Sequence, residues 1–197
     1  MSQPAENLRV RRTRKLLRDA LIELIEERGF DRLTVGGITE RAMVSRAAFY
    51  RNYQDKFHLV EQIFDDAMAE LHGTMADGET RSAAERWAAF FEHIAQYHRF
   101  YGAMLGRKGS TWFAAKMRAS LSDMVKEHLP QPAQAPGRPA PDTLPATLLG
   151  AMFTESITWW LDQGMPSPPR VIAAQSAELA GAVITVANTW ATAPKQG

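Results

Sequence analysis

Apolar residues recur along this chain at intervals of three and four positions, the spacing that places side chains on one face of an α-helix. In the first such segment Leu17, Leu21 and Leu24 share a face, and Gly29 stands where a residue of positive φ often ends a helix. No stretch alternates apolar and polar residues for long enough to predict a strand, and no internal repeat is present. The pattern therefore predicts an all-α protein.

Polar residues of the types that cap helices precede the next three helical segments. Thr34 is expected to cap a short helix that runs to about residue 42, and Ser45 a third helix that runs to about residue 52. Asp55 is expected to cap a long fourth helix. Four more helical patterns follow, at about residues 83–98, 111–128, 144–161 and 169–190. Two proline-rich breaks, at residues 130–145 and 164–169, predict loops between these helices.

The charge of the chain is unevenly distributed. Its 197 residues carry a formal net charge of +1, but residues 1–60 carry +4 and residues 61–197 carry −3. The densest positive cluster lies between Arg9 and Arg18, with four further basic residues between them. A basic N-terminal part indicates a polyanionic partner, and a solvated basic tail is the alternative interpretation.

The composition narrows the classes of chemistry that the chain can perform. Without cysteine it has no disulfide, thiolate metal site or cysteine nucleophile. His93 and His98 are five positions apart, which is the wrong spacing for a metal pair on one helix face, and the adjacent Asp65 and Asp66 diverge. No glycine-rich phosphate loop or nucleophile elbow is present. We therefore expect no catalytic residue, metal or cofactor, and a protein that is not an enzyme.

No segment has the pattern of a secretory signal or a membrane span. The first apolar stretch, residues 16–25, is interrupted by charged residues. No run reaches the roughly 18 to 20 apolar residues that cross a bilayer, and the most apolar region, residues 171–190, still contains polar side chains. We expect a soluble, cytoplasmic protein without a membrane partner.

Two short helices joined by a tight turn at residues 42–45 are central to the functional interpretation. In the second of them Phe49 and Tyr53 lie four positions apart and are expected to face inward. The same helix combines small residues, which let a backbone approach a DNA groove, with long or hydroxylated residues that reach bases and phosphates. The residues expected to face outward are Arg46, Ala47, Tyr50, Arg51 and Asn52. Lys56 adds a cation at the start of the next helix, a position that suits a phosphate.

Residues 38–56, ITERAMVSRAAFYRNYQDK, together with Thr34 before them and Leu59 after them, resemble the DNA-binding signature of TetR-type transcriptional regulators. The resemblance covers residues 11–64. It implies an N-terminal three-helix helix-turn-helix DNA-binding domain in residues 1–54, with a basic arm in residues 1–14. It also implies a C-terminal helical ligand-binding and dimerisation domain in residues 55–197.

The resemblance implies roles for individual residues. Arg46, Ala47 and Arg51 would lie nearest the DNA bases. The residues that would hold phosphates are Thr34, Ser45, Tyr50, Asn52 and Lys56. The basic segment between Arg9 and Arg18 would either contact the DNA backbone or minor groove, or remain solvated.

Several positions depart from the usual pattern of the family. Met43 stands where the turn commonly has glycine, so a positive φ there would be strained. Gly36 and Gly37 lie inside the second helix, where each is less favourable than alanine by about 1 kcal/mol. Ala48 replaces a frequent hydroxyl residue, and Asn52 replaces a frequent histidine. These departures leave the operator sequence and the individual DNA contacts open.

Aromatic residues are concentrated in residues 87–113, which hold eight of the eighteen in the chain. Aromatic side chains at helical spacing usually form plain core, but many rings with a few polar groups are also typical of a ligand pocket. By analogy with TetR-type proteins, the candidate pocket residues are Trp87, Phe91, Met104, Trp112, Phe153 and Trp159. His93, His98 and Glu155 are possible polar anchors, and each is also explained as an ordinary buried or exposed polar residue.

The last predicted helix carries an apolar seam with intervals of four and three. Its members are Ile172, Ser176, Leu179, Val183, Val186 and Trp190. Such a seam packs against another helix. With residues 144–161 it would form an isologous four-helix dimer interface, the usual arrangement of the family, or else it packs within its own subunit.

Together these features predict a sequence-specific, DNA-binding transcriptional regulator. The default form is a homodimeric repressor that a small-molecule effector of unknown identity releases from a palindromic operator. The fourth helix runs from the DNA-binding part into the rest of the chain. We expect it to act as a lever that transmits effector binding to the DNA-binding part. A DNA-binding activator of the same fold and a helical protein-binding adaptor are the alternatives.

Overall fold

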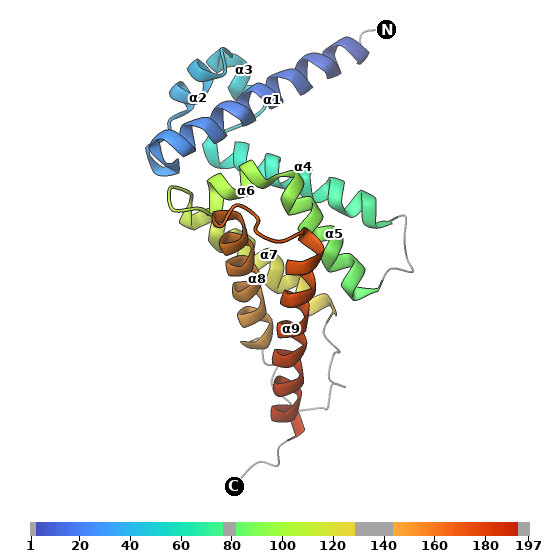
Figure 1. Cartoon of the computed structure of the whole chain (residues 1–197). Coiled ribbons are helices and arrows are strands. Elements are labelled where there is room, and N and C mark those ends of the chain that lie inside the picture. The colour runs from blue at the N-terminus through green and yellow to red at the C-terminus, as the bar shows by residue number, and fades with distance from the viewer. Residues whose placement is uncertain (1–2, 77–81, 129–143, 193–197) are drawn as a thin grey trace, which may run out of the picture. The chain divides into compact units, whose positions relative to one another are not determined.

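The computed structural model describes residues 3–76, 82–128 and 144–192, and within these residues it contains helices and no strand (Figure 1). The all-α prediction is therefore confirmed. The chain divides into two compact units. Unit 1 comprises residues 1–79 and 97–110, and unit 2 comprises residues 80–96 and 111–197. Each unit is thus assembled from two separate stretches of sequence.

Unit 1 is built around a long first helix. Its elements are α1 (Gln3–Arg28), the 3-10 helix η1 (Phe30–Arg32), α2 (Val35–Arg41), α3 (Arg46–Tyr50), α4 (Lys56–Ala76) and α6 (His98–Leu105). Leu17, Leu21 and Ile25 of α1 are completely buried, and α1 packs against both α2 and α6. Burial of a leucine or isoleucine side chain contributes about 1.5–3 kcal/mol, so these residues anchor α1 in the core of the unit.

The C-terminal end of α1 is held by the turn that follows α6. Gly29 has a φ of 82°, and its N–H donates to the Ile25 carbonyl at 2.9 Å. The Phe30 N–H donates to the Lys108 carbonyl at 2.9 Å. The Lys108 ammonium donates to the Glu26 carbonyl at 2.6 Å, where the helix dipole favours a cation. These bonds join two stretches of chain that are far apart in the sequence.

Unit 2 contains α5 (Ala83–Gln96), α7 (Thr111–His128), α8 (Leu144–Asp162) and α9 (Pro169–Thr192). α7 packs on α8, and α9 packs on α5 and α8. The backbones of α7 and α8 come close together at Gly150. A Cβ atom there would lie 2.7 Å from the Arg118 carbonyl oxygen and 2.9 Å from the Ser122 nitrogen. Only glycine fits this contact between two backbones.

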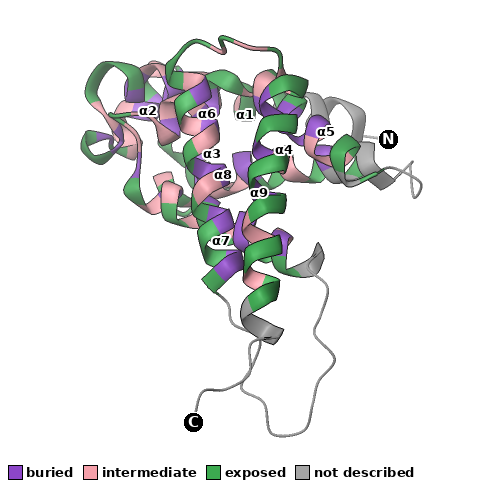
Figure 2. Ribbon diagram, turned by 60° about the horizontal axis from the view of Figure 1, so that its bottom comes forward, coloured by how far each residue is buried: buried purple, intermediate pink, exposed green. Residues whose placement is uncertain are grey.

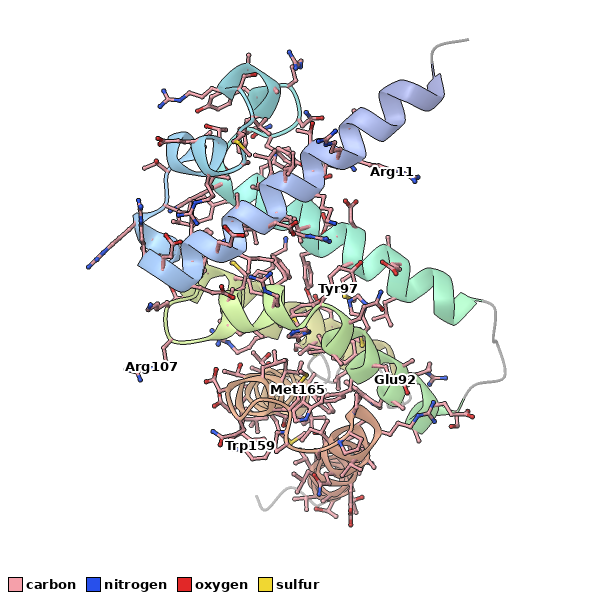
Figure 3. All side chains as sticks on the ribbon, turned by 45° about the horizontal axis from the view of Figure 1, so that its top comes forward. Arg11, Glu92, Tyr97, Arg107, Trp159 and Met165 are labelled. Carbon is pink, nitrogen blue, oxygen red and sulfur yellow. The ribbon has the colours of Figure 1, made fainter. Side chains whose placement is uncertain are left out.

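Trp160 fixes the connection between α8 and α9. Its side chain is buried, and the indole Nε1–H donates to the Ser167 carbonyl at 2.9 Å, so its polar atom is satisfied. Met165 lies in the same turn with a φ of 58° (Figure 3). Arg170, at the start of α9, forms an ion pair of 2.8 Å with Glu92 of α5.

The helix predicted at about residues 83–98 is confirmed to within two residues as α5, but the separate helix α6 (His98–Leu105) was not predicted. α5 ends at Gln96 and α6 begins at His98, because Tyr97 between them has a φ of −102° and a ψ of 21°. The Tyr97 hydroxyl donates to the Glu70 carboxylate of α4. This bond joins residues 27 positions apart, so the local apolar pattern carried no sign of it.

Two further predicted segments, the N-terminal arm and the proline-rich loop, can be compared with the structure. α1 begins at Gln3, so the predicted arm is helical from that residue onward. The proline-rich loop predicted at residues 130–145 falls mainly on residues 129–143, which lie outside the described part of the chain.

Candidate nucleic-acid interface

The turn between α2 and α3 closes tightly on the end of α2. The Val44 N–H donates to the Thr39 carbonyl at 2.9 Å, and the Met43 N–H donates to the Glu40 carbonyl at 3.1 Å. Met43 has a φ of 52° and 90% of its surface is exposed. The backbone conformation is one that favours glycine, and a methionine occupies it. The strain expected at Met43 from the sequence is therefore confirmed.

Both short helices begin with a capping hydroxyl, as predicted. The Gly37 N–H donates to Thr34 Oγ1 at 3.1 Å, and the Ala48 N–H donates to Ser45 Oγ at 3.1 Å. Each hydroxyl accepts through a lone pair and keeps its own O–H for another acceptor. Both residues are exposed, and neither helix has an acidic residue in its first turn. The two hydroxyls are thus suited to donating to an anion.

α3 has an apolar face and a polar face. Phe49 is completely buried, Tyr53 is 4% exposed, and the centres of their rings lie 5.3 Å apart. Ile38 of α2 is also buried, so α3 cannot rotate about its axis without uncovering these residues. Tyr50 is 58% exposed, and its ring meets the Phe49 ring edge-on. The residues exposed on α3 and at its end are Arg46, Ala47, Tyr50 and Arg51.

Two of the residues predicted to hold phosphates, Asn52 and Lys56, donate side-chain hydrogen bonds within the protein. The Asn52 side-chain amide donates to the Ala48 carbonyl at 3.0 Å. The Lys56 ammonium donates to the Phe30 and Asp31 carbonyls at 2.9 and 3.1 Å. Partial burial lowers the pKa of Lys56 from its usual value. Lys56 therefore fastens α4 to η1, and these bonds use two of its three N–H donors.

The first turn of α4 is capped from both directions. The His58 N–H donates to Asp55 Oδ1 at 2.8 Å, which confirms Asp55 as the cap. The Gln54 N–H donates to His58 Nδ1 at 3.1 Å. This arrangement differs from a capping box, because the His58 side chain accepts from the N–H of Gln54, the residue before the cap, and not from the N–H of Asp55 itself. The second bond was not predicted, although the spacing of Asp55 and His58 carries the signal.

Arg41 holds α2 against α1. Its Nη1 and Nη2 atoms donate to the two carboxylate oxygens of Glu27 at 2.7 and 2.8 Å, and Nη1 also donates to Glu23 at 3.2 Å. These bonds raise the pKa of Arg41 and lower the pKa of Glu27. A two-point guanidinium–carboxylate contact fixes orientation as well as distance. The sequence did not predict it, because the partners are 14 and 18 positions away.

Comparison with known families accounts for most of the chain. Residues 17–63 match the family described as bacterial regulatory proteins, tetR family. Residues 85–181 match a TetR C-terminal family described as transcriptional regulator C-terminal region. The chain belongs to the TetR family of transcriptional regulators. The family assignment made from the helix-turn-helix residues is confirmed.

One curated relative matches less than a third of this TetR-family chain. The uncharacterized HTH-type transcriptional regulator YxbF of Bacillus subtilis (strain 168) is 33% identical over 61 residues. The match covers 31% of this chain and spans 16% of the length of that protein.

Solved structures share the fold over almost the whole chain. A TetR regulator from Streptococcus agalactiae 2603V has a TM-score of 0.61 at 18% identity, covering 89% of this chain and 97% of that one. NalD, the secondary repressor of the MexAB-OprM multidrug efflux pump in Pseudomonas aeruginosa, has a TM-score of 0.60 at 17% identity, covering 88% and 96%. DhaS, the dihydroxyacetone kinase operon activator, has a TM-score of 0.54 at 14% identity, covering 88% and 97%. Because a repressor and an activator both share this fold, the fold alone does not determine the sign of regulation.

In this TetR-family chain the N-terminal basic cluster is part of α1. Arg14 lies 3.6 Å from Asp66 of α4, and Arg18 lies 3.8 Å from the neighbouring Asp19. Arg11 projects from α1 into solvent (Figure 3). The side chain of Arg9 lies outside the described residues.

The residues predicted to line an effector pocket fall into both units. Trp87 stacks on Phe153 in unit 2, with ring centres 3.9 Å apart. Phe91 meets Trp160 edge-on at 5.9 Å in the same unit. Met104 is completely buried in α6, which belongs to unit 1.

The other candidate pocket residues are more accessible. Trp112 is half-buried, with the Lys116 ammonium 5.9 Å from the centre of its ring. Trp159 projects from α8 with half of its surface exposed (Figure 3). Among the proposed polar anchors His93 is buried, whereas His98 and Glu155 are exposed.

Helices α8 and α9 each leave large apolar side chains exposed. The many exposed positions along α9 are green in Figure 2. We call the exposed large apolar residues the α8–α9 face: Leu144, Leu148, Trp159, Val171, Leu179 and Val186. The predicted seam of α9 is divided, because Ile172 and Ser176 are buried within the chain while Leu179 and Val186 are exposed. Val183 is half-buried, and the side chain of Trp190 lies outside the described residues.

One segment of α9 has the length and mean hydropathy of a membrane-spanning helix. Pro169–Thr189 is long and apolar enough to cross a bilayer by length and composition, and little of it is buried. The segment still contains polar residues such as Gln175 and Glu178, so it is not an unbroken apolar run. Helices of soluble proteins pass the same test, so it carries little weight.

Proposed function

We propose that this TetR-family protein is a homodimeric transcriptional repressor that binds a palindromic operator and is released from it by a small-molecule effector. The observation that supports DNA binding most strongly is the division of α3. Phe49 of α3 and Tyr53 just beyond its end are buried, while Arg46 and Tyr50 of α3 and its C-cap Arg51 are exposed. A recognition helix must be fixed to its own domain on one side and open to the major groove on the other.

The proposed contacts divide into base and phosphate contacts. Arg46, Ala47 and Arg51 meet base edges, and an arginine can donate two N–H groups to one guanine. The residues proposed to hold phosphates are Thr34, Ser45, Tyr50, Asn52 and Lys56. The free O–H groups of the two capping residues support this assignment, and Lys56 would contribute its third N–H. The proposed DNA-binding domain is residues 1–54, with the ligand-binding and dimerisation domain in residues 55–197.

The α8–α9 face supports the proposed dimer. Six large apolar side chains at 43–58% exposure on two helices of one unit form a surface that a second copy can cover. An isologous pairing of α8 and α9 from two chains gives a four-helix interface. The two DNA-binding domains of the dimer then bind half-sites about 34–36 Å apart, a distance of one turn of DNA.

The effector is proposed to bind among the aromatic residues of the ligand-binding domain. The proposed lining residues are Trp87, Phe91, Met104, Trp112, Phe153 and Trp159. A ligand that favours a different separation of the two DNA-binding domains weakens operator binding. Because coupling between two sites is reciprocal, DNA weakens ligand binding by the same factor. α4, which leads from the DNA-binding domain into the ligand-binding domain, is the proposed lever.

An activator of the same fold is the second candidate, since DhaS is an activator with this fold. A helical adaptor that binds protein through its exposed faces is the third. We further propose a cytoplasmic location, no membrane partner and no enzymatic activity.

The test is fluorescence anisotropy of the purified protein with DNA from upstream of its own gene, at several salt concentrations and with non-specific competitor. About six to ten phosphate contacts lower the affinity by about 10³–10⁵ between 50 and 200 mM salt. Tyr50→Ala and Arg51→Ala should each abolish competitor-resistant binding. Arg107→Ala is the matched control, because it removes one exposed positive charge from the turn after α6 (Figure 3).

The outcomes separate the candidates. Tight, salt-dependent binding that survives competitor and is lost in the α3 variants supports the operator-binding regulator. Binding that competitor abolishes, or that Arg107→Ala weakens as much as Arg51→Ala, indicates only a basic surface. No binding at low salt favours the adaptor. Transcription from the same promoter with and without the protein decides between repression and activation.

A further inference from the structure

Arg46 lies against a glycine of the preceding helix. A Cβ atom on Gly36 would lie 2.7 Å from Nη2 of Arg46, 3.4 Å from its Cζ and 3.7 Å from its Nε. Arg46 is the first residue of α3, and Gly36 lies in the first turn of α2. Side chains on a helix lean toward its N-terminus, which carries the guanidinium back from α3 toward α2. Any side chain at residue 36 would therefore displace the guanidinium from this position.

The adjacent glycine provides a contrast. A Cβ atom on Gly37 would have Thr34 Oγ1 as its nearest neighbour at 3.5 Å, which is an ordinary contact. Both glycines lie in α2, and neither has a positive φ, so the backbone requires glycine at neither position. Both weaken the helix relative to alanine. Only at Gly36 does the missing side chain make room for another residue.

The guanidinium of Arg46 occupies the space that the missing side chain of Gly36 leaves. Within the described part of the chain Arg46 forms no hydrogen bond or ion pair, and it is exposed. Its N–H donors are thus available to a partner outside the chain.

We propose that Gly36 is a positioning residue that determines which base Arg46 recognises. This inference rests on the DNA-binding function proposed above. By having no side chain, Gly36 lets the guanidinium lie beside α2, and that position selects one base pair in each half-site. The chemistry of the guanidinium makes O6 and N7 of a guanine in the major groove the expected acceptors. Arg46 is then the specificity-determining residue for a G·C pair, and Gly36 sets its register.

The test compares base preferences among four proteins: wild type, Gly36→Ala, Gly37→Ala and Arg46→Ala. Each is used to select from a pool of DNA duplexes with a randomised core. Affinities are then measured for the wild-type site and for its single-base variants. A good arginine–guanine pair corresponds to roughly a five- to 150-fold preference for the correct base. Arg46→Ala should remove the preference at one position of the half-site, and Gly36→Ala should reduce or change the preference at that same position.

Two controls separate positioning from a general effect on folding. Gly37→Ala changes the same helix in the same way and should keep the wild-type base preference. Gly36→Ala should unfold at a temperature no lower than Gly37→Ala. The double variant Gly36→Ala/Arg46→Ala should behave as Arg46→Ala alone, because the effect of residue 36 acts through the guanidinium.

The inference is overturned if Gly36→Ala keeps the wild-type preference, if Gly37→Ala loses it equally, or if the effects of the two positions are additive. If Gly36→Ala fails to fold while Gly37→Ala folds, residue 36 has a structural role. This outcome also overturns the inference. A wild-type protein that enriches no sequence would refute the proposed function itself. Specific binding by the wild type with no coupling between residues 36 and 46 refutes the inference alone.

Discussion

Replacing Met43 by glycine is expected to stabilise the protein although it removes a large side chain. Met43 has a φ of 52°, in the left-handed region, which costs a residue other than glycine about 1–2 kcal/mol. Its side chain is 90% exposed, so little packing is lost when it is removed. Glycine makes the unfolded chain more flexible, which offsets about 0.4–1 kcal/mol of the gain. The net stabilisation should be about 0.5–1 kcal/mol.

The assay is thermal unfolding followed by circular dichroism, with wild type and variants at one protein concentration because association raises the apparent stability. For a chain of this size the expected rise in Tm is about 1–4 °C. Met43→Ala is the matched control, because it removes the same side chain but keeps the Cβ atom and therefore the strain. Its stability should lie within about 0.5 kcal/mol of the wild type.

Equal stabilisation by Met43→Gly and Met43→Ala would refute this reasoning, because the exposed side chain and not the backbone would then be the cause. A lower Tm for Met43→Gly would show that the methionine makes contacts that its exposure does not indicate.

Three further outcomes follow from the structure. Gly150→Ala should lower the free energy of unfolding by about 1–3 kcal/mol, measured by chemical denaturation, because its Cβ atom meets the backbone of α7. Leu179→Asp should convert a dimer to a monomer in sedimentation velocity experiments, because it places a charge in the exposed α8–α9 face. Burial and the bond to Glu70 raise the pKa of Tyr97 to about 12. Since this pKa lies above the unfolded value of about 10, its stabilisation is complete below that pH and is lost as the pH rises through 12. Tyr97→Phe should remove one late-titrating group from the ultraviolet titration of tyrosinate.

Each of these outcomes has a control within the chain. Gly102→Ala places a Cβ atom in open space inside α6 and should not destabilise the protein. Ala119→Asp adds the same charge to an exposed position of α7 and should leave the dimer intact. An undisturbed stability in Gly150→Ala, an undisturbed dimer in Leu179→Asp, or an unchanged titration in Tyr97→Phe would contradict the corresponding argument.

The sequence predicted those parts of the fold that depend on local chemistry. Thr34, Ser45 and Asp55 cap the helices they were expected to cap, because a capping hydroxyl or carboxylate bonds to an N–H two or three residues away. Phe49 and Tyr53 are buried for a similarly local reason, since their spacing places them on one side of α3.

Features that depend on contacts between distant residues were not predictable. The break at Tyr97 accompanies a bond to α4, and the ammonium of Lys56 is engaged by carbonyls of η1. Trp159 was placed with the pocket residues by analogy with TetR-type proteins, and its half-exposed position on α8 could not be read from the sequence. In each case the residue type fits several environments, and the tertiary packing selects one of them.

The bonds between Lys108 and the end of α1 limit how the DNA-binding parts of related regulators can be exchanged. A chimera that transplants only residues 1–76 would leave behind the carbonyl that accepts from Phe30 and the ammonium that ends α1. An unsatisfied N–H of this kind costs about 1–3 kcal/mol when it is buried. The part of the chain that contains the helix-turn-helix therefore cannot be exchanged as one continuous segment. A recombination event with a single crossover would separate its parts, and a functional exchange requires residues 97–110 to travel with the N-terminal helices.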